Sequence, residues 1–237
     1  MKVALLTSQE NPLFGYYFQA LQNEGVSIAG VIVDSAQPKK RDLEIHEERT
    51  GGKMPSIPFK TLMQQGVPFW SVENHNNQET LDIVRTQGIE ALVNAGTPRV
   101  LKKPLFDALS LGVINCHPGL LPEFRGCTCV EWAIYLDEPV GNTVHLMVEG
   151  IDAGPILLRE ALSFKKTDSY SDVRVKVYHA NCALVARAVK NLSSGIFTID
   201  DFKPQSEGRY FGVIESEKMK EVTRKLDRGT YRYQNES

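Results

Sequence analysis

The sequence predicts an α/β protein with a mostly parallel sheet and a late antiparallel hairpin. Short apolar runs rich in β-branched residues alternate with helical patterns in the first half of the chain, as in sheets built from strand, helix, strand units. Two later runs, 142–148 and 155–162, are joined by the glycine-punctuated segment 149–154, which favours a hairpin. The 237 residues are 42% hydrophobic, which is enough for one substantial core.

The chain opens with a strand, a helix and a second strand. Residues 3–6 and 28–33 are apolar runs of strand length, and Phe14, Phe18 and Leu21 lie between them at helical spacing. The elements expected next are a strand at 67–72, a helix at 78–87, a strand at 91–93, a short helix at 104–109 and a strand at 113–117. Helices are also expected at 128–136, at 168–192 starting from Thr167 or Asp168, and at 216–228.

The segment 38–54 is dense in charged side chains and contains the pair Gly51 and Gly52. Such composition is typical of a solvated or mobile connection between elements. The alternative is a flap that faces the substrate.

A strand that ends at Pro118 carries two polar side chains. Because side chains alternate between the faces of a strand, Asn115 and His117 lie on one face while Ile114 and Cys116 lie on the other. Pro118 cannot donate to the sheet, so it ends the strand just after the polar pair. In open parallel sheets, ligands bind at this carboxyl edge.

Asp152, in the hairpin loop, completes a candidate catalytic group with Asn115 and His117. An imidazole can transfer a proton near neutral pH, a carboxylate can orient it or accept the proton, and an amide can donate to a developing oxyanion. The same residues also fit turn caps and a core histidine, and spacing alone does not bring Asp152 to His117. His145 lies on the strand that leads into this loop.

A metal site is the rival interpretation, since Cys116, His117, Cys127 and Cys129 lie close together in the sequence. Zinc sites space their cysteines as C-x₂₋₄-C, whereas one residue separates Cys127 from Cys129, and Cys116 faces away from His117. We therefore expect no metal. Four cysteines are also too few for a disulfide framework.

The charge balance and hydrophobic pattern argue against several classes of protein. The net charge is −2, so the chain lacks the basic surface of a nucleic-acid-binding protein. The N-terminal apolar run is too short for a signal sequence, and nowhere do 18 apolar residues follow one another. The sequence therefore predicts no nucleic-acid partner, no membrane association and a cytoplasmic location.

Three motifs occur in register over about forty residues. Residues 115–122 match the pattern Asn-x-His-x-x-Leu-Leu-Pro, residues 141–145 match Gly-x-Thr-x-His, and residues 152–154 match Asp-x-Gly. With these motifs the chain resembles the formyltransferases that use N10-formyltetrahydrofolate. The resemblance implies a Rossmann-like catalytic domain over residues 1–195, followed by a short C-terminal extension over 196–237.

The resemblance also implies a site. The folate would lie against two loops, whose residues are Ala95, Gly96, Thr97, Pro98, Arg99, Val100 and Leu101 in the first and Val148, Glu149, Gly150, Ile151 and Asp152 in the second. The substrate amine would attack the formyl carbon, with Asn115 and protonated His117 stabilising the oxyanion and Asp152 helping to remove the amine proton. Many members have Ser where this chain has Gly119.

The expected substrate is the amino group of a nucleotide-linked deoxyamino sugar, such as a 4-amino-4,6-dideoxyhexose, with a homodimer implied by the sugar enzymes. Alternatives are glycinamide ribonucleotide, methionyl-tRNA, water, or an inactive folate-binding domain. The residues after Gly195 are too few for the barrel of the tRNA enzymes, and the first strand leaves no room for the deformylases' regulatory domain. The loop 7–13 lacks the glycines that cradle a ribonucleotide phosphate and includes Glu10 and Pro12. Residues 203–211 resemble a segment of the sugar enzymes.

Overall fold

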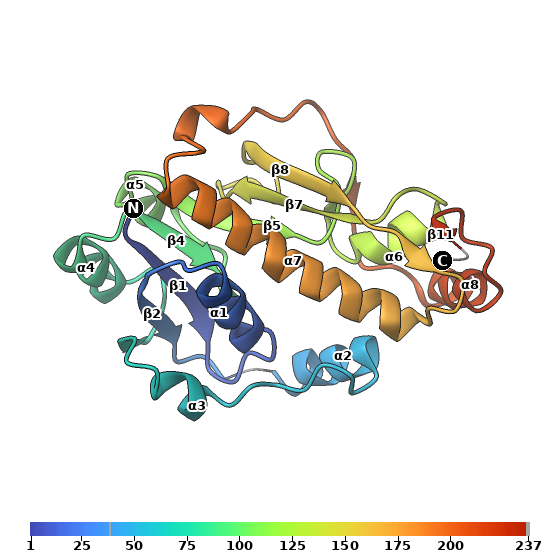
Figure 1. The fold of residues 1–237 in the computed structure, drawn as a ribbon, viewed down its shortest axis with the longest axis horizontal. Coiled ribbons are helices and arrows are strands. Elements are labelled where there is room, and N and C mark those ends of the chain that lie inside the picture. Colours follow the sequence, from blue (N-terminus) through green and yellow to red (C-terminus); the bar gives the residue numbers. More distant parts are fainter. Residues whose placement is uncertain (38, 236–237) are drawn as a thin grey trace.

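A computed structural model describes residues 1–37 and 39–235, and within them the chain forms a seven-stranded sheet with the order β3-β2-β1-β4-β5-β7-β8 (Figure 1). The strands are β1 (Val3–Ser8), β2 (Ile28–Asp34), β3 (Phe69–Val72), β4 (Ala91–Asn94), β5 (Gly112–His117), β7 (Gly141–Leu146) and β8 (Ile156–Ala161). Strands β1 to β5 pair in parallel, whereas β7 is antiparallel to both β5 and β8. The predicted mostly parallel sheet with a late antiparallel hairpin is confirmed.

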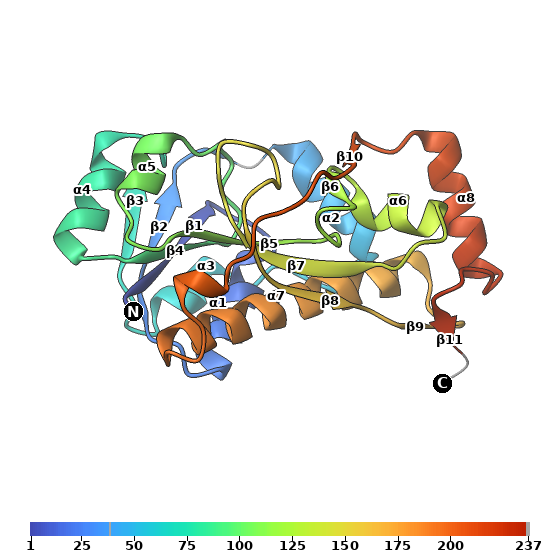
Figure 2. The same ribbon diagram turned by 90° about the horizontal axis from the view of Figure 1, so that it is seen from above.

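Helices cover both faces of this sheet. Helices α1 (Phe14–Asn23) and α7 (Tyr170–Ser193) lie on one face, and α4 (Gln78–Gln87) and α5 (Lys103–Asp107) lie on the other (Figure 2). Alternate residues of β1 therefore enter different cores: Val3 and Leu5 pack in the first layer, and Ala4 and Leu6 pack in the second. Each of these four side chains is fully buried, because a parallel strand between two helical layers has no solvent face.

The start of α7 differs from the predicted one. Ser169 is the N-cap, its side chain accepts from the backbone N–H of Asp172, and the Asp172 carboxylate accepts from the backbone N–H of Ser169 in a capping box. The prediction of Thr167 or Asp168 was wrong. The Asp168 carboxylate instead accepts from the backbone N–H of Lys165 in the preceding turn, at 2.7 Å.

Part of the charged segment forms a helix that the sequence did not predict. Helix α2 (Lys40–Thr50) ends at Gly51, which has the left-handed conformation of a helix C-cap. His46 and Thr50, four positions apart, are buried, and the ring of His46 lies 6.0 Å from that of Tyr178 on α7. Because charged residues surround them, these two buried positions could not be recognised from the sequence. Pro38, at the start of the predicted segment, lies outside the described residues.

The C-terminal segment packs against the loop that follows β5. Strand β10 (Tyr210–Phe211) pairs with β6 (Arg125–Gly126), and β11 (Gln234–Asn235) pairs with β9 (Phe164–Lys165). Helix α8 (Ser216–Asp227) lies beside α6 (Cys129–Tyr135), as Figure 2 shows, and the two remaining elements are α3 (Phe59–Met63) and a 3₁₀ turn at Ile199–Asp201. Within residues 1–37 and 39–235, no helix combines the length and apolar character needed to cross a membrane.

Candidate active site

The carboxyl end of β5 presents two polar side chains on one face, as the alternation predicts. Cys116 packs in the core on the other face. Asp152, from the loop between β7 and β8, approaches His117, with 3.4 Å between Asp152 Oδ2 and His117 Nδ1. This contact brings the predicted pair together across 35 residues. Both groups are largely removed from water, because 6% of the His117 side chain and 14% of the Asp152 side chain are exposed.

Asp152 is held by its side chain and by its backbone. It has the left-handed conformation with φ at 49°, which aspartate tolerates better than most residues. The backbone N–H of Gly126 donates to Asp152 Oδ2 at 2.9 Å. Gln205 Nε2 donates to the Asp152 carbonyl at 2.9 Å, and Arg125 Nη2 donates to Gln205 Oε1 at 2.8 Å. The segment that contains Gln205 resembles a segment of the sugar enzymes, but sequence reasoning gave Gln205 no role.

The hydrogen bonds of His117 fix which ring nitrogen exchanges protons. Its Nε2 lies 2.7 Å from the carbonyl oxygen of Phe124, and because a carbonyl only accepts, Nε2 carries the hydrogen. In the neutral ring, Nδ1 is therefore the unprotonated nitrogen, and it faces Asp152. Burial lowers the pKa of His117, although Asp152 and the Phe124 carbonyl oppose the shift. This shift favours the neutral ring, and the role of a protonated His117 expected from the sequence stays a prediction.

Asn115 belongs to a chain of oriented hydrogen bonds. Asn94 Nδ2 donates to Asn115 Oδ1 at 2.9 Å, so the Asn115 amide nitrogen points the other way, toward His145 Nε2 at 3.0 Å. His145 donates from Nδ1 to the carbonyl of Leu146, which leaves Nε2 as the acceptor. Burial lowers the pKa of His145 to about 4, so the ring stays neutral. One hydrogen of the Asn115 amide is left for a substrate oxygen.

A pocket of about 160 Å³ adjoins Asp152 between the two loops predicted to hold folate. Its lining includes eight of the predicted residues: Arg99, Val100, Leu101, Val148, Glu149, Gly150, Ile151 and Asp152. Ala95, Gly96, Thr97 and Pro98 do not line it. Ala95 is fully buried in the core, and the backbone N–H groups of Gly96 and Thr97 donate to Asn94 Oδ1.

Three further residues line this pocket that sequence reasoning did not assign to it: Phe106, His145 and Met147. His145 and Met147 lie two positions apart at the end of β7, so the alternation of strand side chains gives them the same face. This alternation could have identified both residues from the sequence. Phe106 lies on α5, and only the packing of this helix brings it to the pocket.

A family model described as "Formyl transferase" matches residues 1–189. The chain belongs to the formyl transferase family. The curated relatives include methionyl-tRNA formyltransferase of Thermotoga sp. (strain RQ2), 25% identical over 199 residues, which are 83% of this chain and 60% of that protein. The enzyme of Desulfotalea psychrophila is 28% identical over 170 residues, 71% of this chain and 50% of that protein. The chain thus spans between half and three fifths of these relatives' length.

Solved structures share the fold at low identity. A sugar N-formyltransferase from Shewanella sp FDAARGOS_354 has a TM-score of 0.62 at 21% identity, over 90% of this chain and 77% of that chain. Glycinamide ribonucleotide transformylase 1 from Symbiobacterium toebii has a TM-score of 0.63 at 22% identity, over 87% of this chain and 94% of that chain. These similarities establish the fold of this formyl transferase family member, and both substrate classes occur among its structural neighbours.

All four cysteines of this formyl transferase family member are free thiols. Cys116 and Cys129 are buried, whereas Cys127 is exposed. Across residues 1–37 and 39–235, no group of three or more His, Cys, Asp or Glu side chains is placed to hold a metal ion.

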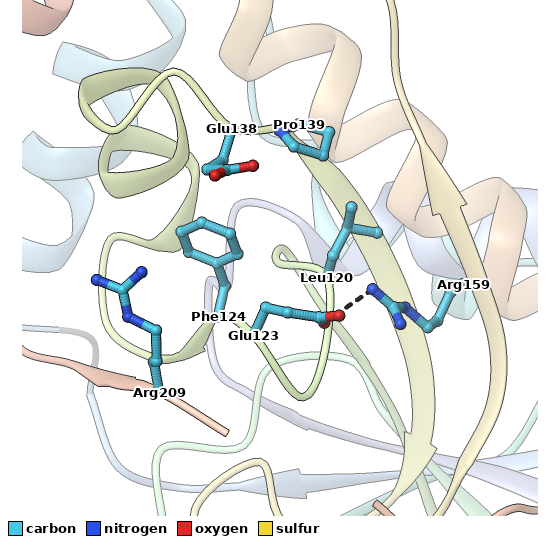
Figure 3. A pocket seen from close by; sticks show the side chains of 7 residues that line it. All are labelled: Leu120, Glu123, Phe124, Glu138, Pro139, Arg159 and Arg209. Carbon is cyan, nitrogen blue, oxygen red and sulfur yellow. Dashed lines mark hydrogen bonds and ion pairs between the residues drawn. The ribbon is translucent and has the colours of Figure 1, made fainter. Parts of the chain in front are cut away.

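Another pocket, of about 230 Å³, lies beside Phe124 and apart from the candidate catalytic residues. Its lining is Leu120, Glu123, Phe124, Glu138, Pro139, Arg159 and Arg209, and Glu123 pairs with Arg159 at 2.8 Å (Figure 3). Neither Asn115, His117 nor Asp152 lines it. Of the two pockets, the one between residues 99–101 and 148–152 includes Asp152 in its lining, whereas this second pocket includes Phe124, whose carbonyl lies 2.7 Å from His117 Nε2.

Proposed function

We propose that this protein transfers a formyl group from N10-formyltetrahydrofolate to the amino group of a nucleotide-linked deoxyamino sugar. The observation that carries the proposal is the convergence of Asn115, His117 and Asp152 beside the pocket between residues 99–101 and 148–152. A protein that only binds folate has no need of an oriented amide, imidazole and carboxylate. Their joint placement favours an enzyme over an inactive binding domain.

The chemistry of the pocket suits one ring of a folate. The pocket combines apolar walls from Val100, Leu101, Phe106 and Ile151 with backbone groups of the 148–152 loop, as expected for a flat heterocycle with polar edges. Bound there, the folate supplies the formyl carbon that the amine attacks. Of the catalytic residues named above, Asp152 itself lines the pocket, while His145 links its floor to Asn115.

The proposed mechanism gives each group a step that its hydrogen bonds support. As the amine nitrogen bonds to the formyl carbon, Asn115 Nδ2 donates its remaining hydrogen to the formyl oxygen, on which negative charge develops. The amine proton passes to Asp152 or, through it, to Nδ1 of His117, which starts unprotonated. The same proton then goes to the departing folate nitrogen, so the enzyme returns to its starting state.

The loop between β1 and α1 favours a sugar nucleotide over glycinamide ribonucleotide. Donors at the start of α1 are already used: the backbone N–H groups of Leu13 and Phe14 donate to the side chain and the carbonyl of Asn11. Glu10 adds a negative charge and lines the adjacent pocket. A phosphate would meet few free donors and an unfavourable charge here.

The test is a comparison of kcat/KM with 10-formyltetrahydrofolate and two sets of amines. We expect a dTDP-, UDP- or GDP-linked 4-amino-4,6-dideoxyhexose to be formylated far faster than glycinamide ribonucleotide. A preference for the ribonucleotide would refute the sugar assignment and leave formyl transfer in place. No formyl transfer to any amine, with folate still bound, would favour the inactive folate-binding domain.

The cellular context follows from the same proposal. A nucleotide-linked amino sugar is a precursor for polysaccharide biosynthesis, and both substrates are cytoplasmic metabolites in this scheme. The homodimer implied by the sugar enzymes stays a prediction, which sedimentation of the purified protein would check.

A further inference from the structure

A pocket of about 340 Å³ lies between α2, α6, the start of α7 and the segment before α8. This volume falls in the range of small-molecule sites, roughly 300–1,000 Å³. Its lining comprises Arg41, Ile45, Glu48, Arg49, Thr128, Glu131, Tyr170, Val213, Ile214 and Met219. The four residues of α2 are spaced as one helical stripe, so this helix forms one wall.

The pocket adjoins the candidate active site through the loop before α6. Thr128, at its edge, lies two residues after Gly126, whose N–H holds the Asp152 carboxylate at 2.9 Å. Two trans peptide links keep the Cα atoms of Gly126 and Thr128 within about 8 Å of each other. The edge of this pocket at Thr128 therefore lies close to the backbone group that holds Asp152.

Arg41 and Glu48 in the lining pair with each other, whereas the Glu131 carboxylate faces Arg49 in the lining and the buried Arg174 beneath it. Glu131 Oε1 lies 3.5 Å from Arg174 and 3.8 Å from Arg49, and it accepts from the Tyr170 hydroxyl at 2.5 Å. Burial acts to raise the pKa of Glu131, but the two guanidinium groups outweigh it and hold the pKa below its usual value. Two cations thus face one anion, and Arg49 is the partly exposed cation, with 27% of its side chain accessible.

Glu131 also has an unused acceptor. Only 2% of its side chain is exposed, and its Oε2 has no hydrogen-bond partner among the described residues. A buried carboxylate oxygen without a donor is costly, so a ligand with an N–H or O–H group would stabilise it. The apolar side of the pocket includes Val213, an exposed apolar residue with 72% of its surface accessible, which suits a flat ring.

From these contacts we infer that the pocket between α2 and α6 binds the nucleoside diphosphate part of the substrate, with the diphosphate at Arg49 and a hydroxyl or ring N–H at Glu131. The inference rests on the proposed function and adds the subsite that selects the substrate. Arg41, now paired with Glu48 at 2.7 Å, is a second cation within the same wall. By contrast, the pocket next to Glu10 has no cationic side chain: its lining is Glu10, Asn11, Leu43, Ser56, Ile57, Pro58 and Phe59.

The experiment titrates the full-length protein with free dTDP, UDP and GDP by calorimetry. We expect at least one to bind, and Arg49→Gln to weaken it by about 10-fold or more through loss of a charge-assisted hydrogen bond. Val213→Trp, which fills the pocket from an exposed position, should weaken it as well. Arg187→Gln is the matched control, because Arg187 pairs with Glu160 at 2.8 Å on the exposed surface of α7.

Two readouts separate this inference from the function on which it rests. Arg49→Gln should raise KM for the sugar nucleotide while kcat and folate affinity stay within a few-fold of the parent, and Arg49→Lys should restore much of the affinity. Absence of binding by all three diphosphates, or parental affinity in folded Arg49→Gln and Val213→Trp, overturns the inference. Diphosphate binding that depends on Arg49, with no formylation of any sugar nucleotide, would retain the subsite and refute the sugar substrate.

Discussion

The carboxylate of Asp34, at the end of β2, accepts two hydrogen bonds from the guanidinium of Arg99, in the loop after β4. The distances are 2.9 Å from Nε and 3.0 Å from Nη2. Asp34 is fully buried and also accepts from the backbone N–H groups of Ala36 and His75. Burial acts to raise the pKa of Asp34, but these donors outweigh it and lower the pKa. The pair fixes the 95–101 loop, one wall of the proposed folate pocket.

Asp34→Asn should therefore weaken folate binding. The amide keeps the shape but loses the charge that pairs with Arg99, so the loop is held less firmly. We expect affinity for folate to fall by about 10-fold, since small displacements of positioning groups cost up to about 10². Calorimetry with a non-transferable folate measures this, and Asp82→Asn, at an exposed pair with Arg85, is the control. Unchanged affinity would mean that the loop is held without this pair.

His117→Ala should lower kcat by about 10²–10⁴, the usual range for a lost proton-transfer group. Folate affinity should stay near the parental value, because the proposed pocket is lined by other residues. Steady-state kinetics and calorimetry on the same preparation measure both. Activity within a few-fold of the parent would remove His117 from the mechanism, and a loss of folate binding would make it a ligand-positioning residue.

Asp152→Asn should lower kcat by about 10² or more. Asparagine tolerates the left-handed backbone at this position and can still accept from the Gly126 N–H, but it has no charge to receive the amine proton. Asp137→Asn is a close control, because Asp137 also has a left-handed backbone, with φ at 59°, on the exposed turn after α6. If the Asp152 variant loses only little activity, the amine proton must pass to solvent or directly to His117.

Gly119→Ser should reduce activity although many related enzymes have serine at the matching position. A Cβ atom at residue 119 would lie 2.6 Å from Nε2 of His117 and 2.8 Å from the Phe124 carbonyl oxygen, so it would disturb the hydrogen bond between them. We expect kcat to fall by about 10- to 10²-fold through misplacement of the imidazole. Gly212→Ala, where nothing lies within 4 Å of a Cβ, should be neutral. Full activity of the serine variant would show that the loop adjusts.

Stability should fall as the pH drops from about 6.5 toward 4. Burial lowers the pKa of His145 to about 4, so in this interval the unfolded chain binds a proton that the folded protein does not, and protonation favours unfolding. This residue alone accounts for up to about 3 kcal/mol of unfolding free energy, and the lowered pKa values of His75 and His117 act in the same direction.

Urea unfolding at several pH values measures the dependence. His145→Gln should flatten it, whereas His179→Gln, at an exposed position on α7, should leave it unchanged. A stability that stays constant between pH 6.5 and 4 in the parent would contradict the prediction.

The sequence by itself determined the order of the seven main strands and of most helices, and the face on which the first two catalytic candidates lie. Periodicity is a local property, so the boundaries of α4 agree with the predicted helix 78–87, and the two-residue alternation of β5 separates Asn115 and His117 from Cys116. The helix within 38–54 was not predicted, because its buried residues His46 and Thr50 are recognised only once α2 packs against α7.

Only the tertiary structure decided which distant groups meet and which atoms of them interact. The contact of Asp152 with His117 depends on the folding of the hairpin loop and on Gln205, which comes from the C-terminal segment. The hydrogen-bond directions that leave Nδ1 of His117 unprotonated are set by the Phe124 carbonyl. Side-chain periodicity extends over neighbouring residues along one element, whereas these contacts join segments 7 to 53 residues apart and exist only after the chain has packed.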